Sequence, residues 1–266
     1  MALVQHKSVD ARFQQQVDNA ATYLIPFIEE GLKLEPGMRV MEIGCGEGGV
    51  LKPFVKRGLD VVGVDLATQR IASAQAFLAE EIKAGKAEFM VQNVYETGFA
   101  ERFAGAFDLI LLKDTIEHIP EQEKFIPYLK QFLKPGGKVF FGFPPWYMPF
   151  GGHQQICSSK VLGLLPYYHL LPRPLYRGIL KLAKEPERTI QELMEIKDTG
   201  ISLDRFEKIM RRDGWHINTR TVFLFNPIYK YKFGLKPRKQ AKFIANIPGL
   251  RNFVSTAGWY LVEPKN

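Results

Sequence analysis

The sequence predicts an α/β fold in which helices cover both faces of a doubly wound, mostly parallel, seven-stranded sheet. Short apolar runs recur through the first half of the chain, helical patterns lie between them, and turn residues separate the two. A continuous apolar run, such as residues 61–64, predicts a strand that is buried on both faces, as in a parallel sheet covered by helices. Such alternation implies right-handed crossovers between neighbouring parallel strands.

Residues 1–34 precede this alternation and predict a helical segment. Apolar side chains at helical spacing indicate one or two amphipathic helices over residues 10–33. We expect the core of the fold over residues 35–143. The predicted strands cover residues 39–43, 60–65, 87–92, 107–112 and 138–143, and the predicted helices cover 49–57, 68–83 and 121–133.

The regular alternation of predicted strands and helices stops after Phe143. Residues 144–200 are rich in proline, leucine and aromatic residues, and they predict an apolar insertion after strand five. An apolar insertion at this place is expected to bury itself by closing over the sheet as a lid. Residues 201–266 then complete the sheet, with a helix at 202–212 and strands at 215–225 and 255–262.

Composition excludes several classes of protein. The 266 residues are 46% hydrophobic and 24% charged, which excludes general disorder. The two cysteines, Cys45 and Cys157, cannot form a disulfide framework, and no Cys/His cluster has zinc-ligand spacing, so no metal site is expected. Residues 1–18 show no secretory signal, and no apolar run approaches the roughly 20 residues that span a bilayer. We therefore expect a cytoplasmic protein.

The positive charge lies at the end of the chain. The formal net charge is +8, and residues 205–266 carry 13 Lys and Arg against three Asp and Glu. The preceding residues are slightly acidic. A basic surface of this kind can meet nucleic acid, an anionic membrane or a phosphorylated substrate, and it can equally be a solvated face.

The sharpest motif lies at the first strand–helix junction, where residues 42–48 read EIGCGEG. Glycines there let the backbone turn tightly and approach a ligand. Gly44, Gly46 and Gly49 fit the dinucleotide pattern G-x-G-x-x-G. Asp65, at the end of the second strand, is the type of acid that accepts hydrogen bonds from ribose hydroxyls. Together they predict an adenosine-bearing cofactor rather than a merely tight turn.

Acidic residues around this turn distinguish between cofactors. Glu42, two residues before Gly44, would repel the pyrophosphate of a dinucleotide. Glu47 and Asp114 make the same crevice more acidic. An acidic crevice favours a sulfonium ligand with an α-ammonium group, and therefore S-adenosyl-L-methionine over a nicotinamide dinucleotide.

These motifs resemble those of class I S-adenosylmethionine-dependent methyltransferases of the small-molecule branch. Residues 42–48 are similar to motif I, residues 107–119 (FDLILLKDTIEHI) to the fourth-strand motif, and residues 133–137 (LKPGG) to the turn before strand five. The resemblance covers about residues 34–143 and resumes near residue 202. It implies S-adenosyl-L-methionine as cofactor and S-adenosyl-L-homocysteine as product.

The resemblance also implies a set of cofactor-binding residues. The acid after strand two would bind both ribose hydroxyls, the segment after strand three would hold the adenine, and the end of strand four would face the methionine. The family often has Asp at the position of Asn93, and it usually has a small residue where Lys113 stands. The predicted set comprises Glu42, Gly44, Cys45, Gly46, Asp65, Leu66, Asn93, Val94, Lys113 and Asp114.

Two histidines are candidate general bases. Methyl transfer is an in-line displacement, so the enzyme mainly supplies alignment and excludes water, and it needs a base only for a protonated nucleophile. His118 follows strand four and His153 follows strand five, at the edge of the sheet where ligands bind. Gly151 and Gly152 would let the backbone bend so that His153 points inward. His118 could equally make a structural hydrogen bond at the start of a helix.

We expect methyl transfer to a small or medium-sized, hydrophobic acceptor. The first alternative is an RNA or DNA methyltransferase that uses the basic last quarter of the chain. Another is a non-catalytic binding protein built on the cofactor fold, and a nicotinamide-dependent dehydrogenase is less favoured still. Residues 226–229 (NPIY) resemble a signature of amino-methylating enzymes, but they follow a late strand. The apolar insertion and the basic tail also allow peripheral membrane contact.

Overall fold

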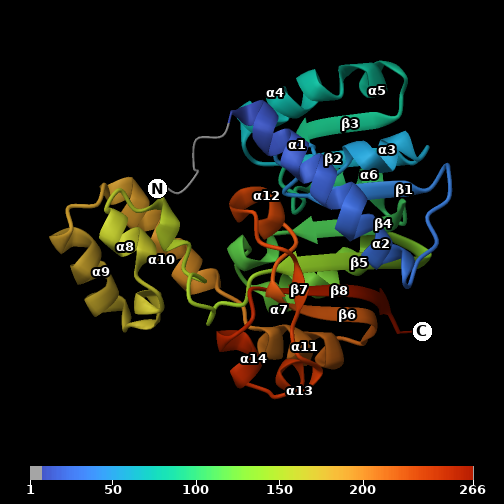
Figure 1. Ribbon diagram of the computed structural model, residues 1–266. Helices are drawn as coiled ribbons and strands as arrows, with labels where there is room; N and C mark the ends of the chain where they lie inside the picture. The colour runs from blue at the N-terminus through green and yellow to red at the C-terminus, as the bar shows by residue number, and fades with distance from the viewer. Residues whose placement is uncertain (1–7, 266) are drawn as a thin grey trace.

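The computed structural model describes residues 8–265, which surround one mixed sheet (Figure 1). The strand order is β3-β2-β1-β4-β5-β8-β6-β7. The first five strands in this order are parallel, and β8 runs antiparallel to both β5 and β6. The strands are β1 Arg39–Ile43, β2 Asp60–Asp65, β3 Ala87–Val91, β4 Phe107–Lys113, β5 Leu133–Phe143, β6 Trp215–Phe225, β7 Arg238–Lys239 and β8 Ala257–Pro264.

The predicted doubly wound, mostly parallel fold is confirmed, but the sheet has eight strands rather than seven. The additional strand, β7, is only two residues long and pairs with the edge of β6. Both of its residues are exposed and basic, so no alternation of apolar and polar residues marks them as a strand. Strand β5 begins at Leu133 because this residue pairs with Phe107 before an irregularity in the register.

Several helices are shorter than the sequence predicts. The expected helix over residues 49–57 is a turn followed by five helical residues, and the one over 68–83 breaks at Leu78, whose backbone leaves the helical region. In the N-terminal segment, of which residues 1–7 lie outside the described part, a π-helical turn at Ala20–Leu24 separates α1 from α2. The helices are α1 Val9–Asn19, α2 Ile25–Glu29, α3 Lys52–Lys56, α4 Thr68–Phe77, α5 Ala79–Lys83, α6 Thr97–Phe103, α7 Gln122–Tyr128, α8 Lys160–Leu164, α9 Arg173–Leu182, α10 Glu187–Thr199, α11 Leu203–Arg212, α12 Tyr229–Phe233, α13 Lys242–Ala245 and α14 Leu250–Phe253.

Two apolar cores lie on the two faces of the sheet. Alternate residues of each central strand point to opposite faces, so that Ile110 and Leu112 of β4 enter one core while Leu109 and Leu111 enter the other. Side chains of α6, α7 and α11 complete the first core, and side chains of α2, α3 and α4 complete the second. The sheet is therefore covered on both faces, which leaves its strand ends as the place for a ligand.

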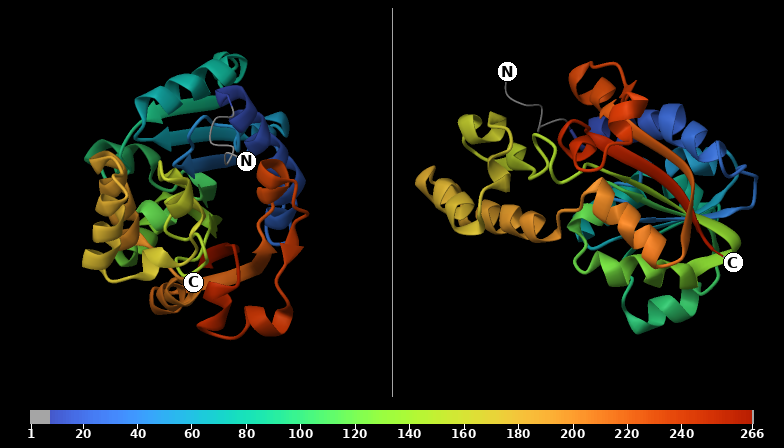
Figure 2. Two further views of the ribbon diagram at one scale, coloured as in Figure 1. Left: turned by 60° about the vertical axis from the view of Figure 1, so that its left-hand side comes forward. Right: turned by 90° about the horizontal axis from the view of Figure 1, so that it is seen from below.

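The insertion between β5 and α11 forms a separate lobe (residues 144–200, hereafter the insertion lobe). It stands beyond the ends to which the parallel strands point (Figures 1 and 2). Helices α8, α9 and α10 bury an apolar cluster of their own: Cys157, Leu162, Tyr168, Tyr176, Leu180, Ile190, Leu193 and Met194. The expectation that this insertion can bury itself only by closing over the sheet is therefore wrong, because its helices cover one another.

Candidate active site

The predicted site residues lie at or after the carboxyl ends of β1, β2, β3, β4 and β5. Strands β1 and β4 are neighbours, and the strand order runs in opposite directions on either side of them. Ligands of open α/β sheets bind at such a switch point. The glycine turn leaves β1 there, and Asp114 leaves β4.

The glycine turn is fixed by β2. The backbone N–H groups of Gly44 and Cys45 both donate to the carbonyl oxygen of Val64, at 2.8 and 3.1 Å. Gly44 has a φ of +75°, and a Cβ atom there would lie 2.6 Å from the hydroxyl oxygen of Thr115. A glycine is therefore required at this position, both for the backbone angle and for the close approach of Thr115, in the turn after β4.

Asp65 ties the glycine turn to the start of α4. Its Oδ2 accepts from the N–H of Gly46 at 2.9 Å, and its Oδ1 accepts from the N–H of Ala67 at 2.8 Å. Each carboxylate oxygen has a further lone pair, so the carboxylate can still accept from ribose hydroxyls. The neighbouring Leu66 is 71% exposed. An exposed leucine beside this carboxylate fits the contact surface of an adenosine.

The segment predicted to hold the adenine forms a short turn after β3. The side-chain oxygen of Asn93 accepts from the N–H of Tyr95 at 3.0 Å. Val94 is buried, and its carbonyl oxygen accepts from the hydroxyl of Tyr128 at 2.8 Å. The turn is therefore held to α7, with the Asn93 side chain on its exposed side.

The methionine end of the predicted site is an acidic crevice with one lysine. Glu42 is 2% exposed, and its Oε2 has no hydrogen-bond partner among residues 8–265. Burial raises the pKa of Glu42 well above its usual range, although Lys113 opposes this. The Lys113 ammonium lies 2.6 Å from Oδ2 of Asp114. Burial disfavours its charge, but Asp114 and Glu42 outweigh burial and raise the pKa of Lys113.

A second buried carboxylate lies in the same crevice. Glu117 is 4% exposed, and neither of its carboxylate oxygens has a partner among the described residues. Burial, and then the charge of Asp114, raise the pKa of Glu117 well above its usual range. Buried polar groups are almost always hydrogen-bonded in folded proteins. Unpartnered oxygens on Glu42 and Glu117 therefore fit a site that is completed by a cationic ligand, such as the ammonium and sulfonium groups of S-adenosyl-L-methionine.

The structure brings the two predicted histidines together. The rings of His118, after β4, and His153, in the insertion lobe, have centroids 5.0 Å apart. Burial, and then the nearby His118, lower the pKa of His153 to about 4. Desolvation also lowers the pKa of His118. Both imidazoles are therefore neutral near pH 7, and a neutral imidazole can take up a proton.

Backbone strain marks the same place. His153 has a φ of +53° and Asp114 a φ of +54°, and neither is glycine. Such conformations cost about 1–3 kcal/mol each and cluster at functional sites. The charge of Asp114 favours protonation of both histidines. Asp114 would therefore stabilise an imidazolium formed on either ring.

Three side chains of the crevice also have the donors of a cation site. The ligand atoms of Glu117, His118 and His153 all lie within 4.8 Å of one another. Carboxylate and imidazole groups at this spacing could hold one divalent cation. The expectation of no metal site rested on spacing along the chain, which does not detect a histidine that comes from the insertion lobe.

Gly151 and Gly152 serve close packing rather than bending. A Cβ atom on Gly151 would lie 2.1 Å from the carbonyl oxygen of Trp146, and one on Gly152 would lie 2.3 Å from Cβ of His169. His169 is completely buried, and its Nε2 lies 2.9 Å from the carbonyl oxygen of Trp146. The loop that carries His153 is therefore positioned by His169, a residue to which the sequence assigned no role.

Helix α12 also contributes residues that the sequence did not place at the site. Burial opposes the charge of Asp114, but Lys113 and then Lys232 of α12 outweigh burial and lower the pKa of Asp114. Burial, and then the charge of Asp114, raise the pKa of Tyr229 to about 12. Helix α12 packs on the N-terminal helices, where the hydroxyl of Tyr231 lies 3.4 Å from that of Thr22. The sequence separates Tyr229 from Asp114 by more than 100 residues, and no local motif connects them.

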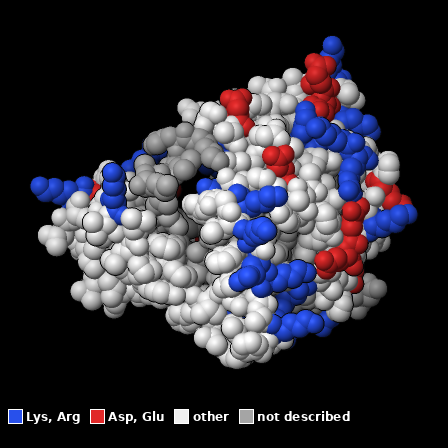
Figure 3. Space-filling model, viewed as in Figure 1, with Lys and Arg blue, Asp and Glu red and all other residues white. Residues whose placement is uncertain are grey.

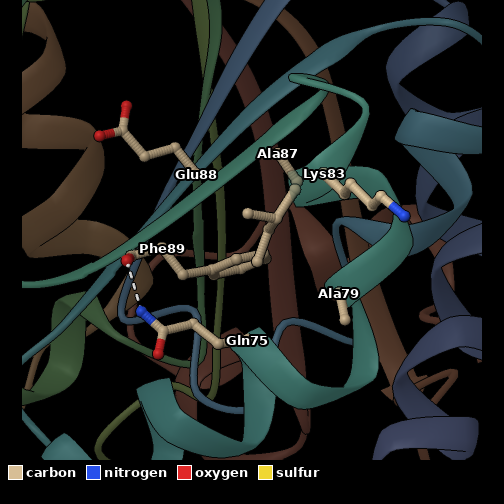
Figure 4. Close-up of a pocket in the computed structure, with 7 residues that line it drawn as sticks. Gln75, Ala79, Lys83, Ala87, Glu88 and Phe89 are labelled. Atoms are coloured by element: carbon tan, nitrogen blue, oxygen red, sulfur yellow. Dashed lines mark hydrogen bonds between the residues drawn. The ribbon is translucent and has the colours of Figure 1, made fainter.

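A hollow of about 400 Å³ lies elsewhere, at the β3 edge of the sheet. Figure 4 shows Gln75 of α4 reaching across it to donate to the carbonyl oxygen of Phe89 at 3.1 Å. None of the predicted site residues lines this hollow. We therefore assign it no part in cofactor binding.

Comparison with protein families finds one matching model. Residues 13–149 match a family described as "Methyltransferase domain". This match covers slightly more than half of the chain, from α1 to the start of the insertion lobe.

Similar sequences include enzymes named "Ubiquinone biosynthesis O-methyltransferase". The one from Nitrosococcus oceani is 34% identical over 146 residues, which are 52% of this chain and 58% of that protein. The one from Paracidovorax citrulli is 32% identical over 112 residues, which are 42% of this chain and 46% of that protein. The matched region therefore spans about half the length of these relatives.

Similar solved structures share the fold at low sequence identity. A geranyl diphosphate methyltransferase in complex with S-adenosylmethionine has a TM-score of 0.57 and 13% identity, and the match covers 93% of this chain and 85% of that one. A [4+2]-cyclase has a TM-score of 0.54 and 12% identity, with coverages of 91% and 80%. The fold is thus shared by proteins with different named activities.

Proposed function

We infer the activity from the premise that this chain belongs to the methyltransferase domain family. The family and the class I fold predicted from the sequence are thereby confirmed, and S-adenosyl-L-methionine is the cofactor of this family. We propose that the chain transfers a methyl group from S-adenosyl-L-methionine to an oxygen of a small, apolar acceptor. The paired, neutral His118 and His153 beside Asp114 are the observation that carries this proposal.

The proposed roles of the cofactor residues follow from their contacts. The glycine turn and Asp65 hold the adenosine, and Asn93 contacts the adenine edge. Glu42 lies in the crevice with an unpartnered oxygen for the cationic methionine end. The cofactor supplies an electrophilic methyl group on a sulfonium. The proposed role of the protein is to align the acceptor with the methyl group.

The histidines determine which acceptors can react. A hydroxyl must lose its proton as the new bond forms, and His153 can take that proton because its imidazole is neutral. Asp114 then stabilises the imidazolium through its charge. The names of the relatives, which are O-methyltransferases, support an oxygen acceptor. The exposed apolar side chains of the insertion lobe, such as Leu164 and Leu165, support an acceptor with an apolar body.

A nucleic-acid acceptor is the second candidate, because Lys and Arg gather over α12, β7 and α13 in Figure 3. Much of the remaining basic charge of residues 205–266 is neutralised locally. Arg251 pairs with Asp204 and Glu207, and four other arginines of this region also pair with acids: Arg205, Arg211, Arg212 and Arg220. The positive charge without an acidic partner is thus smaller than the sequence count suggests.

A thermal-shift measurement tests the cofactor part of the proposal. S-adenosyl-L-homocysteine should raise the melting temperature, since a ligand that binds only the folded state stabilises it. Asp65→Ala should remove most of this rise. Asp60→Ala is the matched control, because Asp60 lies at the other end of the same strand and pairs with Lys86. A rise with NADH and none with S-adenosyl-L-homocysteine would contradict the proposal.

An isotope-transfer assay tests the acceptor part. The chain is incubated with methyl-labelled S-adenosyl-L-methionine and phenols that carry alkyl tails of increasing length. We expect label on the phenolic oxygen, with a KM that falls as the tail lengthens, because an apolar tail leaves water on binding. Labelling of RNA or DNA, with none of the phenols, would favour the second candidate. Cofactor binding without transfer to any acceptor would favour a binding protein on this fold.

A further inference from the structure

We propose that the insertion lobe docks on a bilayer of anionic phospholipids, so that a lipid-soluble acceptor reaches the site from the membrane. This inference rests on the proposed function for the identity of the acceptor, although the docking itself does not depend on turnover. No helix among residues 8–265 could cross a bilayer. The contact is therefore with the membrane surface.

The charged side chains in the first part of the lobe are all basic. Residues 144–184 carry five Lys and Arg and no Asp or Glu. Two of the five, Arg173 and Arg177, pair with acids of α10. The other three, Lys160, Lys181 and Lys184, have no ion pair among the described residues. Unpaired ammonium groups of this kind are attracted to the phosphate groups of an anionic membrane.

Large apolar side chains lie exposed between these lysines. The lobe already has a buried cluster of its own, so the exposed residues are additional to what its folding uses. Single exposed apolar residues are ordinary, but a dense group of them marks a contact surface. The exposed members and their exposed fractions are Val161 (74%), Leu164 (58%), Leu165 (43%), Tyr167 (39%), Leu175 (58%) and Leu182 (86%).

The placement of the lobe connects this surface to the active site. The lobe protrudes beyond the carboxyl ends of the strands in Figure 1 and in the right view of Figure 2. Its residue His153 lies with its ring centroid 5.0 Å from that of His118, which follows β4. The hydroxyl of Tyr167 donates to the carbonyl oxygen of Phe253 at 3.2 Å, and the rings of Tyr147 and Phe253 are 5.3 Å apart. These contacts hold the lobe against α14. A lobe that rests on lipid would therefore hold the crevice close to the membrane surface.

Vesicle sedimentation with the full chain tests the proposal. The vesicles are phosphatidylglycerol mixed with phosphatidylcholine, compared with phosphatidylcholine alone, at increasing NaCl. We expect binding to the anionic vesicles that weakens with salt, because lysine–phosphate attraction is screened. The double variant Leu164→Asp/Leu182→Asp should weaken binding about tenfold or more, because it places charge where apolar side chains enter the interface.

The matched control is Phe243→Asp on α13. Phe243 is 70% exposed and lies in the basic last quarter of the chain, outside the lobe. We expect this variant to bind vesicles within about twofold of the unchanged chain, since a surface substitution away from the contact has little effect. The rise in melting temperature with S-adenosyl-L-homocysteine shows that each variant is folded, and it reports on the proposed function separately.

Three results would overturn the docking proposal. The first is that the chain does not sediment with anionic vesicles. The second is that Phe243→Asp abolishes vesicle binding while the lobe variant retains it, which would place the contact on α13. The third is that single-stranded RNA binds the lobe and displaces the vesicles at physiological salt, which would make nucleic acid its partner. Vesicle binding without any response to S-adenosyl-L-homocysteine would support docking and contradict the proposed function alone.

Discussion

The two sides of the candidate site are held in different ways. On the cofactor side, the N–H of Gly44 donates to the carbonyl oxygen of Val64, and the N–H of Gly46 donates to the side chain of Asp65. Val64 and Asp65 are the last two residues of β2. On the acceptor side, His153 lies in an insertion lobe that has its own apolar cluster. The lobe meets the sheet domain through contacts such as the bond from the Thr199 hydroxyl to the carbonyl oxygen of Glu117. The cofactor side is therefore rigid and local, whereas the acceptor side depends on how the lobe sits.

Replacing His153 should give the largest effect and separate the two sides. His153→Ala should lower turnover by about 10²–10⁴-fold for a hydroxyl acceptor, the range of general-base catalysis. Affinity for S-adenosyl-L-homocysteine should not change, because the glycine turn and Asp65 do not contact the lobe through any hydrogen bond of the described residues. Calorimetry and single-turnover kinetics measure the two quantities.

His118→Ala is the competing measurement. The two rings are neighbours, so either one could accept the proton. Full turnover in His153→Ala and a large loss in His118→Ala would move the base to the sheet side of the crevice. Full turnover in both variants would show that the reaction needs no base, as for a carbon or sulfur nucleophile.

Acidification should lower the stability of the folded state through His169, which lies in the insertion lobe. Burial lowers the pKa of His169 to about 4, against about 6.5 in an unfolded chain. The unfolded chain therefore binds the proton more readily between pH 6.5 and 4, so the folded state loses stability as the pH falls through this window. The loss can reach about 3 kcal/mol, since one pKa unit corresponds to about 1.4 kcal/mol.

Chemical unfolding between pH 7 and 4 measures this loss. His169→Gln is the informative variant, because an amide keeps a donor for the carbonyl oxygen of Trp146 but does not titrate in this range. The variant should be less stable than the unchanged chain at pH 7 and should show a shallower decline with acid. The buried His153 titrates in the same window and contributes equally in both proteins. An identical pH dependence in the two proteins would contradict a contribution from His169.

The difference between the cofactor side and the acceptor side also determines which site residues the sequence could predict. The glycine turn, Asp65 and the end of β4 lie within short motifs, so the positions of these residues on the sheet follow from the order of the strands. Tyr229 and Lys232 approach Asp114 from α12. The place of α12 depends on packing against α1, where the side-chain amide of Gln15 donates to the carbonyl oxygen of Tyr231. That packing leaves no local pattern in the sequence.

The insertion lobe shows a second limit of prediction from the sequence. Its apolar residues were expected to cover the crevice, because a sequence pattern gives the amount of apolar surface but not its partner. Three helices that cover one another bury the same residues in a cluster of their own. The unpartnered Glu117 was also not detectable, because its burial arises from contacts between α10 and the turn after β4.

Replacing Gly44 tests the rigidity of the cofactor side. Gly44→Ala places a Cβ atom 2.6 Å from the Thr115 hydroxyl oxygen at a φ of +75°. Such strain costs about 1–3 kcal/mol, so we expect affinity for S-adenosyl-L-homocysteine to fall about 10–100-fold as the turn shifts. Gly46→Ala is a useful comparison, since the nearest atom to its Cβ would be 3.8 Å away, at the flexible end of Arg70. Equal losses in the two variants would attribute the effect to φ alone and not to the contact with Thr115.

The smallest effect concerns the basic last quarter of the chain, and it tests whether nucleic acid shares the acceptor side. Arg205, Arg212, Arg220 and Arg251 are paired with acids of the same chain, so the lysines of α12 and α13 and the residues of β7 supply most of the unpaired charge. We therefore predict weak, nonspecific binding of single-stranded RNA that disappears near physiological ionic strength, because phosphate contacts release counterions as they form. Fluorescence anisotropy across a salt series measures it. Lys239→Gln should lower the salt slope by about one unit or less, as expected for the loss of one phosphate contact. A tight complex with one structured RNA at physiological salt would contradict this prediction, and it would make nucleic acid the leading acceptor.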